Sequence, residues 1–282
     1  MLKNNVETFL ACDKDYEQAR IVMFGAPFDS TTSFRPGTRF GPNAVRSESF
    51  GIETYSPYQN RDLEDIDVMD SGDIELRIGD TAAVLEQIYD RAAGIIADEK
   101  IPFMIGGEHL VTLGAFRAAA EKHPDIHIVH FDAHADLRED YLGVKLSHAC
   151  VLRRCWEIVG DDRLHQYGIR SGEKAEFEFA RVHTDMHPFS VADVTELVKE
   201  IGQKPVYLTL DLDVLDPSVF PGTGTPEPGG VTFEELRRAV TAAAGGLNVV
   251  ACDVNELSPH YDHSGISTAA ACKIIREILL AL

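Results

Sequence analysis

Basic residues are scarce in this sequence of 282 residues. Lysine and arginine number 26 against 46 aspartates and glutamates, which gives a formal net charge of −20. Nucleic acids and anionic membrane surfaces repel a protein of this sign, so neither is expected as a partner. The excess of acid is compatible with cationic ligands such as metal ions, amines and guanidinium groups, and equally with a charge that serves only solubility.

The sequence also lacks the signals of export, membrane insertion and disulfide bonding. No apolar run approaches the roughly 18 residues of a membrane span. Residues 1–20 lack the apolar core and the cleavage site of a secretory signal. The five cysteines are odd in number, scattered and without a CxxC pair. We therefore expect reduced thiols in a cytoplasmic protein.

No linker or internal repeat divides the chain, so the sequence predicts one domain over residues 1–282. Short apolar runs predict buried strands at residues 20–24, 102–105, 126–131, 206–210 and 247–251, with a weaker one ending at 167–169. Helical periodicity occurs at residues 80–98, 113–120, 148–159, 191–201, 233–244 and 266–282. This alternation predicts an α/β fold with three α/β/α layers and a central, mostly parallel sheet.

Reactive side chains follow three of the predicted strands. Residues 132–136 contribute Asp132, His134 and Asp136, residues 211–213 contribute Asp211 and Asp213, and the GGEH segment at 106–109 contributes His109. Residues two apart in an extended segment point the same way, and parallel sheets bind ligands outside the carboxyl ends of their strands. All six side chains are therefore expected at one rim, beside Pro/Gly-rich loops at 33–42 and 221–230.

Four aspartates that converge without a counter-charge repel one another in a partly dry site. Two divalent ions that share bridging carboxylates remove this repulsion and leave positions for water. Oxygen ligands with two imidazoles suit Mn²⁺, and Ni²⁺, Co²⁺, Fe²⁺ and Zn²⁺ also accept them.

Each motif taken singly has a structural interpretation as a turn, a cap or a buried histidine. Their coincidence at three strand ends is what favours a metal centre. His127 and His130 lie within an apolar run and are interpreted as core or sheet-surface residues. Four further histidines lie in polar segments and are expected to be exposed and without a role: His123, His165, His183 and His187.

These motifs resemble those of the ureohydrolase family, which includes arginases and agmatinases. The match comprises GGEH at 106–109, DAHAD at 132–136 and DLDVLDP at 211–217. His148 stands at the position of the family's catalytic histidine, and Glu256 stands at that of a substrate-binding glutamate. The resemblance extends from about residue 22 to the C-terminus and implies the arginase-like fold. The sequence departs from the common pattern at Ala149, where glycine usually follows the histidine.

The resemblance also implies how two Mn²⁺ ions would be bound. One ion would be held by His109, Asp132, Asp136 and Asp211, and the other by His134, Asp132, Asp211 and Asp213, so that Asp132 and Asp211 bridge. A hydroxide between the metals would attack the guanidinium carbon, and the intermediate would release urea.

Further roles follow from the same resemblance. Asp136 would relay the proton of the nucleophile to the leaving amine. Glu256 would hold the guanidinium nitrogens by charge-assisted hydrogen bonds, and His148 would serve as a proton shuttle or substrate contact. Asp216 is interpreted as structural, a turn residue or an outer neighbour of the ligands.

Within the family, the loops resemble those of agmatine-hydrolysing members. Arginases hold the substrate carboxylate with an asparagine at the position of Arg138, and their Asp-rich segment is missing after residue 170. We therefore expect agmatine, a small dication, to be hydrolysed to putrescine and urea. Guanidinobutyrase, aminopropylagmatine ureohydrolase and arginase activities are the alternatives. The contact of the distal amine is open between groups near residues 35–41 and Glu227.

Two interpretations from other classes are a binuclear-metal deacetylase and a metal-binding pseudoenzyme. Deacetylases lack the DxDxxDP spacing, and a pseudoenzyme would lack ligands that are all present here. The family resemblance implies a homo-oligomer, a trimer or hexamer. The apolar residues between 274 and 280 fit either a core or a subunit interface.

Overall fold

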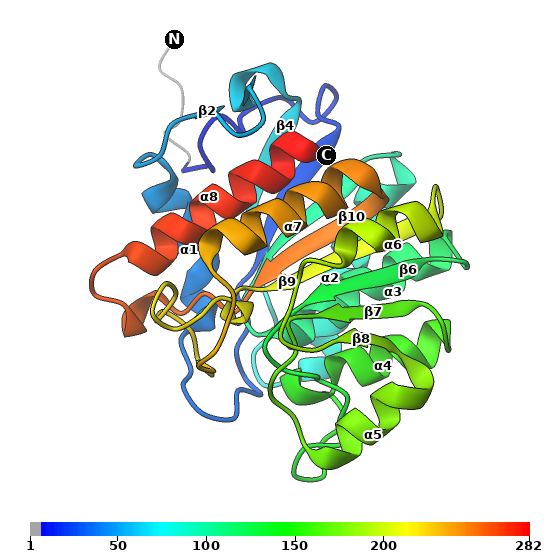
Figure 1. Ribbon diagram of the computed structural model, residues 1–282. Helices are drawn as coiled ribbons and strands as arrows, with labels where there is room; N and C mark the ends of the chain where they lie inside the picture. The colour runs from blue at the N-terminus through cyan, green and yellow to red at the C-terminus, as the bar shows by residue number, and fades with distance from the viewer. Residues whose placement is uncertain (1–6) are drawn as a thin grey trace.

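The computed structural model describes residues 7–282, and residues 1–6, where the predicted domain begins, lie outside the described part. Eight strands form one sheet in the order β4-β1-β5-β10-β9-β6-β7-β8 (Figure 1). Every neighbouring pair in it is parallel. In chain order the strands are β1 (Ile21–Ala26), β4 (Val68–Asp73), β5 (Ile101–Gly106), β6 (His127–Phe131), β7 (Leu164–Tyr167), β8 (Asp185–His187), β9 (Pro205–Asp211) and β10 (Asn248–Asn255). A separate antiparallel ribbon joins β2 (Tyr55–Ser56) and β3 (Arg61–Asp62).

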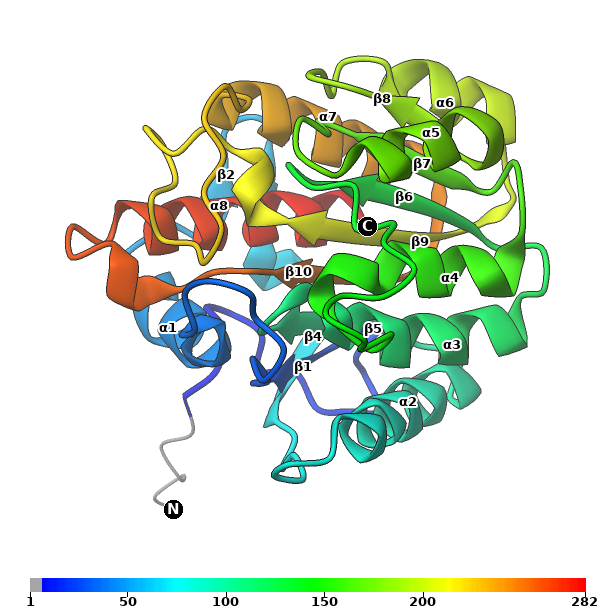
Figure 2. The same ribbon diagram turned by 90° about the horizontal axis from the view of Figure 1, so that it is seen from below.

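Helices cover both faces of the sheet (Figures 1 and 2). One face carries α1 (Gly41–Ser49), α6 (Val194–Ile201), α7 (Phe233–Gly246) and α8 (Ile266–Ala281). The other carries α2 (Thr81–Ala97), α3 (Thr112–Lys122), α4 (Val151–Val159) and α5 (Lys174–His183). This confirms the predicted three-layer α/β/α fold with a parallel central sheet.

The two faces bury separate hydrophobic cores. Phe103 and Phe131 belong to the core under α7 and α8, and Phe24 and Phe116 to the core under α2 and α3. Burying a side chain of this size contributes about 1.5–3 kcal/mol. The apolar residues 274–280 of α8 lie in the first core, so they are core rather than interface residues.

Several short or polar elements were not predicted from periodicity. These are the edge strands β4 and β8, the ribbon β2–β3, and helices α1 and α5. The segment predicted as a helix from residue 148 begins as a 3-10 turn, His148–Cys150, and α4 follows it. None of the four histidines expected to be exposed is so: His165 is buried in β7, where its ring bonds to His127 and Asp185, and His123, His183 and His187 are half-buried. No helix within residues 7–282 has the length and apolar character that crossing a membrane requires.

Candidate metal centre

The six predicted ligands meet at the middle of the sheet's carboxyl edge. β5, β10, β9 and β6 are adjacent in that order, and Asn255 at the end of β10 pairs with Asp211 at the end of β9. His109 follows β5, and residues 132–136 follow β6. The strand order therefore brings together every ligand named from the sequence, and it adds β10, after which Glu256 comes next.

His109 faces three of the aspartates. Its Nδ1 lies 3.0 Å from Asp132 Oδ2, 3.3 Å from Asp136 Oδ2 and 3.4 Å from Asp211 Oδ2. The turn that places it requires glycine, because a Cβ at Gly107 would lie 2.0 Å from the carbonyl oxygen of Phe28. The GGEH segment therefore positions His109 by passing against the loop that follows β1.

His134 forms a second group on the other side of Asp132. Its Nδ1 lies 3.0 Å from Asp213 Oδ2 and 3.5 Å from Asp132 Oδ1. The backbone N–H of His134 donates to Asp132 Oδ1 at 2.6 Å, and that of Asp213 donates to Asp211 Oδ1 at 2.8 Å. Asp132 thus presents one oxygen to each histidine, as a bridging ligand must.

The positive charge near the aspartates of this centre is too small to balance their negative charge. Burial, reinforced by Asp132, raises the pKa of Asp136 to about 7. Burial and the neighbouring Asp213 and Asp132 raise the pKa of Asp211 well above its ordinary value. Burial alone would raise the pKa of Asp132, but hydrogen bonds with three histidines hold it well below its usual range.

The carboxylates also change the pKa of His109. Burial disfavours the charged form of His109, yet its bonds to Asp132, Asp136 and Asp211 raise its pKa well above the ordinary value. Buried carboxylates repel one another, and the neighbouring imidazoles favour their protonated, positively charged form. Divalent cations bound at this place would supply the positive charge that the carboxylates require. Within residues 7–282, ligand atoms converge to within 4.8 Å in the groups His109–His130–Asp132 and Asp132–His134–Asp213.

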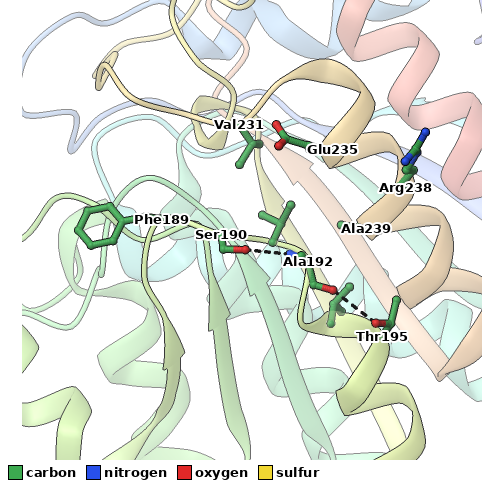
Figure 3. Close-up of a pocket in the computed structure, with 10 residues that line it drawn as sticks. Phe189, Ser190, Ala192, Thr195, Val231, Glu235, Arg238 and Ala239 are labelled. Atoms are coloured by element: carbon green, nitrogen blue, oxygen red, sulfur yellow. Dashed lines mark hydrogen bonds between the residues drawn. The ribbon is translucent and has the colours of Figure 1, made fainter.

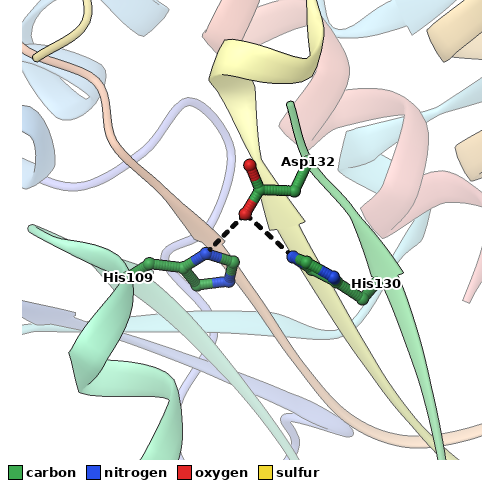
Figure 4. Close-up of side chains that lie close together, drawn as sticks. All are labelled: His109, His130 and Asp132. Carbon is green, nitrogen blue, oxygen red and sulfur yellow. Dashed lines mark hydrogen bonds and ion pairs between the residues drawn. The ribbon is translucent and has the colours of Figure 1, made fainter. Parts of the chain in front are cut away.

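His130, interpreted from the sequence as a core or sheet-surface residue, contacts the centre (Figure 4). It is fully buried, as predicted, and its Nε2 lies 2.9 Å from Asp132 Oδ2. Gln166 Nε2 donates to His130 Nδ1 at 3.1 Å, so Nε2 carries the hydrogen and donates to the aspartate. Its position two residues before Asp132, on the same strand face, was the available signal.

A second contribution missed from the sequence lies beneath His109. Thr209 Oγ1 lies 2.9 Å from His109 Nε2 and donates to Asp253 Oδ1 at 2.6 Å. Asp253 is fully buried in β10 and also accepts a bond from the hydroxyl of Tyr207 at 2.5 Å. The ring of His109 is therefore oriented through its non-ligand nitrogen, as metal-binding imidazoles are in general.

His148 lies in the wall of the pocket above the centre. The backbone N–H of Ser33 donates to His148 Nε2 at 3.2 Å, so this nitrogen is an acceptor. The N–H of His148 donates to Thr31 Oγ1 at 3.1 Å, and the N–H of Thr31 donates to Glu108 at 2.7 Å. Burial, then the charged rings of His134 and His109, lower the pKa of His148 to about 4, so its imidazole is neutral at pH 7.

Glu256 is buried beside the centre and held from below. Its Oε1 accepts the backbone N–H of His109 at 2.8 Å, and its own N–H donates to the Gly107 carbonyl at 2.9 Å. Glu256 and Asp136 both have left-handed backbones, with φ of 67° and 52°. This conformation costs about 1–3 kcal/mol at a non-glycine residue and is concentrated at functional sites.

A pocket of about 270 Å³ opens onto His134, Asp136 and His148. Its lining includes His134, Asp136 and His148 together with Ser33, Arg138, Tyr141, Ser171, Glu173, Glu176 and Thr225. Arg138 is paired with Glu173, at 2.9 Å, and with Glu176, at 3.5 Å. The pocket can therefore hold an elongated polar molecule with one end at the ligand cluster.

Asp216 has the structural role that was predicted for it. Its carboxylate accepts the N–H groups of Ser218 at 3.0 Å, Gly229 at 2.8 Å and Gly230 at 3.0 Å. Bonds from the Ser218 hydroxyl and these N–H groups lower the pKa of Asp216 to about 2. It thereby ties the loop at 221–230 to the end of β9.

Another cavity, of about 320 Å³, lies between the segment after β8 and helix α7 (Figure 3). Its wall is largely apolar, with Val191, Val194 and Val231, and Glu235 and Arg238 add the charged groups. None of the predicted site residues lines it. The reactive groups are gathered at the pocket over the sheet edge instead.

Comparison with known proteins gives one consistent result. A sequence model of the arginase family matches residues 19–281. The chain is 43% identical to the agmatinase of Bacillus cereus and 44% identical to that of Bacillus subtilis, in both cases over 97% of this chain and 96% of the relative. The crystal structure of agmatine ureohydrolase of Thermoplasma volcanium superposes with a TM-score of 0.89 at 32% identity, covering 99% of this chain and 94% of that one.

Proposed function

The chain belongs to the arginase family, and from this premise we propose that it hydrolyses agmatine to putrescine and urea at a centre of two divalent cations. The observation that supports this most strongly is the pair of histidine–carboxylate groups that share Asp132. Two relatives that are more than 40% identical along nearly the whole chain are agmatinases.

The proposed ligands are those expected from the sequence. One cation would be held by His109, Asp132, Asp136 and Asp211, and the other by His134, Asp132, Asp211 and Asp213. When bound, two such cations supply a nucleophilic water at neutral pH and stabilise negative charge at the reacting carbon. Mn²⁺ is the proposed metal, on the basis of the oxygen-rich donor set.

The remaining groups bind the substrate and move protons. Glu256 has one oxygen bonded to the His109 N–H, and its other oxygen receives the guanidinium nitrogens. Asp136 accepts the proton of the attacking water and delivers it to the leaving nitrogen. His148 lines the pocket and serves as a proton shuttle or substrate contact; its Nε2 already accepts the N–H of Ser33, so the neutral ring offers the hydrogen on Nδ1.

The choice of agmatine rests on the pocket wall as well as on the relatives. Arginine carries a carboxylate that agmatine lacks, and Arg138, the cation of this pocket, is already paired with Glu173 and Glu176. An acidic protein of net charge −20 also attracts a dication over distance.

The proposal extends to the setting in which the enzyme works. All five cysteines are free thiols, which supports a reducing cytoplasm. We propose a trimer or hexamer of this chain as the working form, to be checked as a mass of three or six times the 31.1 kDa subunit by sedimentation.

A substrate panel tests the proposed reaction. Purified protein loaded with Mn²⁺ is assayed for urea from agmatine, 4-guanidinobutyrate, arginine and N-(3-aminopropyl)agmatine. We expect kcat/KM for agmatine to exceed the others by at least about tenfold, the discrimination that one mismatched polar or apolar group gives. A different preferred substrate contradicts the agmatine proposal, and urea from none of them contradicts the reaction class.

4-Guanidinobutyrate is the second candidate substrate, and one observation favours it. Arg138 lines the pocket with its guanidinium over the Tyr141 ring, at 4.9 Å from the ring centre, where a substrate carboxylate would meet it. Its pairing with two glutamates weakens this case.

A further inference from the structure

Glu227 is a half-buried loop glutamate whose backbone and side chain are both held by hydrogen bonds. It lies between Pro226 and Pro228, which restrict the backbone on both sides. Arg170 donates to its carbonyl oxygen from Nε at 3.2 Å and from Nη2 at 2.8 Å. The hydroxyl of Ser171 donates to its Oε1 at 2.9 Å. Because backbone and carboxylate are both fixed, this side chain is presented in one orientation.

The carboxylate lies at the rim of the substrate pocket. Glu227 Oε1 is 4.0 Å from Nε2 of His134, which lines the pocket together with Ser171 and Thr225. The carboxylate of Glu227 is separated from His134 Nδ1, the proposed metal-ligating nitrogen, by the width of the imidazole ring and the 4.0 Å between Nε2 and Oε1. A four-methylene chain, whose terminal groups are roughly 7 Å apart at ordinary bond lengths, covers that distance.

The other acids beyond the ligand cluster are already engaged. Glu176 is buried and accepts the N–H groups of Leu137 at 2.9 Å and Glu173 at 2.7 Å. Glu173 is paired with Arg138. Within residues 7–282, Oε2 of Glu227 has no hydrogen-bond donor, and 38% of the side chain is exposed. Oε2 of Glu227 is therefore available to an incoming cation, and Glu227, unlike Glu173, has no arginine paired with its carboxylate.

We infer that Glu227 determines substrate specificity by accepting the distal ammonium group of the substrate, an inference that rests on the proposed function. A role through His134 alone is disfavoured, because 4.0 Å is too long for a hydrogen bond and Oε1 is already occupied by Ser171. Ser171 and Arg170 are its positioning residues, and they explain why a half-exposed loop glutamate is fixed.

The test compares two substrates that differ only at the far end. Glu227→Gln keeps the shape and the bond from Ser171 but removes the charge. Agmatine ends in an ammonium group, whereas n-butylguanidine ends in a methyl group. We expect KM for agmatine to rise about tenfold, as loss of a charge-assisted hydrogen bond predicts. The kcat/KM for n-butylguanidine should stay within about twofold, and kcat for agmatine should change little.

Glu86→Gln on α2 is the matched control, since it removes the same charge from an exposed helix face far from the pocket. Its kinetics should equal those of the unaltered protein. Inhibition provides a readout without turnover: putrescine should inhibit the variant about tenfold less well, and n-butylamine equally well.

Three outcomes would overturn the inference. Equal losses on agmatine and n-butylguanidine with lower bound metal would place Glu227 behind His134 instead. Unchanged kinetics on both substrates would leave it without a role. An equally weakened inhibition by putrescine and n-butylamine would show a loss of pocket shape. If the unaltered protein prefers another substrate to agmatine, the proposed function fails before any variant is compared.

Discussion

At the scale of single residues, Asp132 carries most of the geometry of the centre. It offers one oxygen to His109 and the other to His134, and its carboxylate is further held by His130. A carboxylate held by three imidazoles has little freedom to rotate. The consequences are measurable at residues that never touch the substrate.

His130 is predicted to support metal binding through Asp132. Replacing His130 with leucine removes the donor to Asp132 Oδ2, and the leucine side chain still fills the buried position. The Kd for Mn²⁺ should rise about 10–100-fold, as for other outer groups that orient metal ligands. Competition with a chelating dye measures it, and excess Mn²⁺ should restore most of kcat. Unchanged affinity would mean that His130 only fills space.

Glu256 is predicted to act on the substrate and not on the metal. Glu256→Gln retains an acceptor for the His109 N–H but loses the charge that holds the guanidinium. The kcat/KM for agmatine should fall about 10–100-fold, the effect of one or two charged hydrogen bonds. Metal content, measured by mass spectrometry, should be unchanged. A loss of metal in this variant would contradict the assignment.

Some residues of the centre could be predicted from the sequence, and others could not. Asp132 and Asp211 follow apolar runs directly, and His109 and Asp213 come within three residues of a strand end, so their place at the sheet edge is readable from order alone. His130 was interpreted as a core or sheet-surface residue without a role at the centre, although its strand position puts it on the face of Asp132. Thr209 was not identified, because a hydroxyl within a buried strand has no sequence pattern that distinguishes packing from a bond to His109.

At the scale of elements, the centre depends on four adjacent strands and the loops that follow them. Apolar periodicity predicted β5, β6, β9 and β10 within a few residues. It did not predict that β10 lies between β5 and β9, because strand order is decided by helix crossovers and tertiary packing. The edge strands β4 and β8 are short or polar, with sequences VMDSGD and DMH, so they lack an apolar signal.

Arg170, which follows β7, is predicted to hold the connection between β9 and α7 in place. Its guanidinium donates to the carbonyl oxygens of Asp213 at 2.8 Å, Val214 at 3.0 Å and Glu227 at 2.8 Å. Arg170→Met removes the donors to the carbonyl oxygens of Asp213 and Glu227, whereas Val214 keeps the N–H of Val231, and it should lower the free energy of unfolding by about 2–3 kcal/mol. Urea denaturation with an unchanged m value measures the loss. Arg170→Lys should lie between the two proteins; equal stability of all three would exclude the clamp.

At the scale of the whole molecule, the net charge of −20 has only a local connection to the centre. The four clustered aspartates and Glu256 are a small part of the 46 acids. The remaining acids form a general negative surface that attracts cations over distance and is weakened by salt. Selectivity belongs to the fixed groups of the pocket.

Stability is predicted to fall on acidification through His127, remote from the ligands. Burial and the charge of His165 lower the pKa of His127 to about 4, against 6.5 ordinarily. Between these values the unfolded chain binds a proton that the folded protein excludes, so stability rises with pH across this window and is fully present above it. His127→Asn should show a shallower fall in unfolding free energy from pH 6.5 to 4. A parallel fall in both proteins would contradict this.

Two cations held by the clustered ligands are proposed to carry out hydrolysis of the guanidino group. The most direct test measures urea release from agmatine while metal-free protein is titrated with Mn²⁺ and bound metal per subunit is determined. We predict no activity without metal, and a rate of urea release that increases with added Mn²⁺ until two ions are bound per subunit. The Asp211→Asn variant should not reach two bound ions per subunit. Full activity in metal-free protein, or an activity that saturates at one bound ion per subunit, would contradict hydrolysis by a pair of cations.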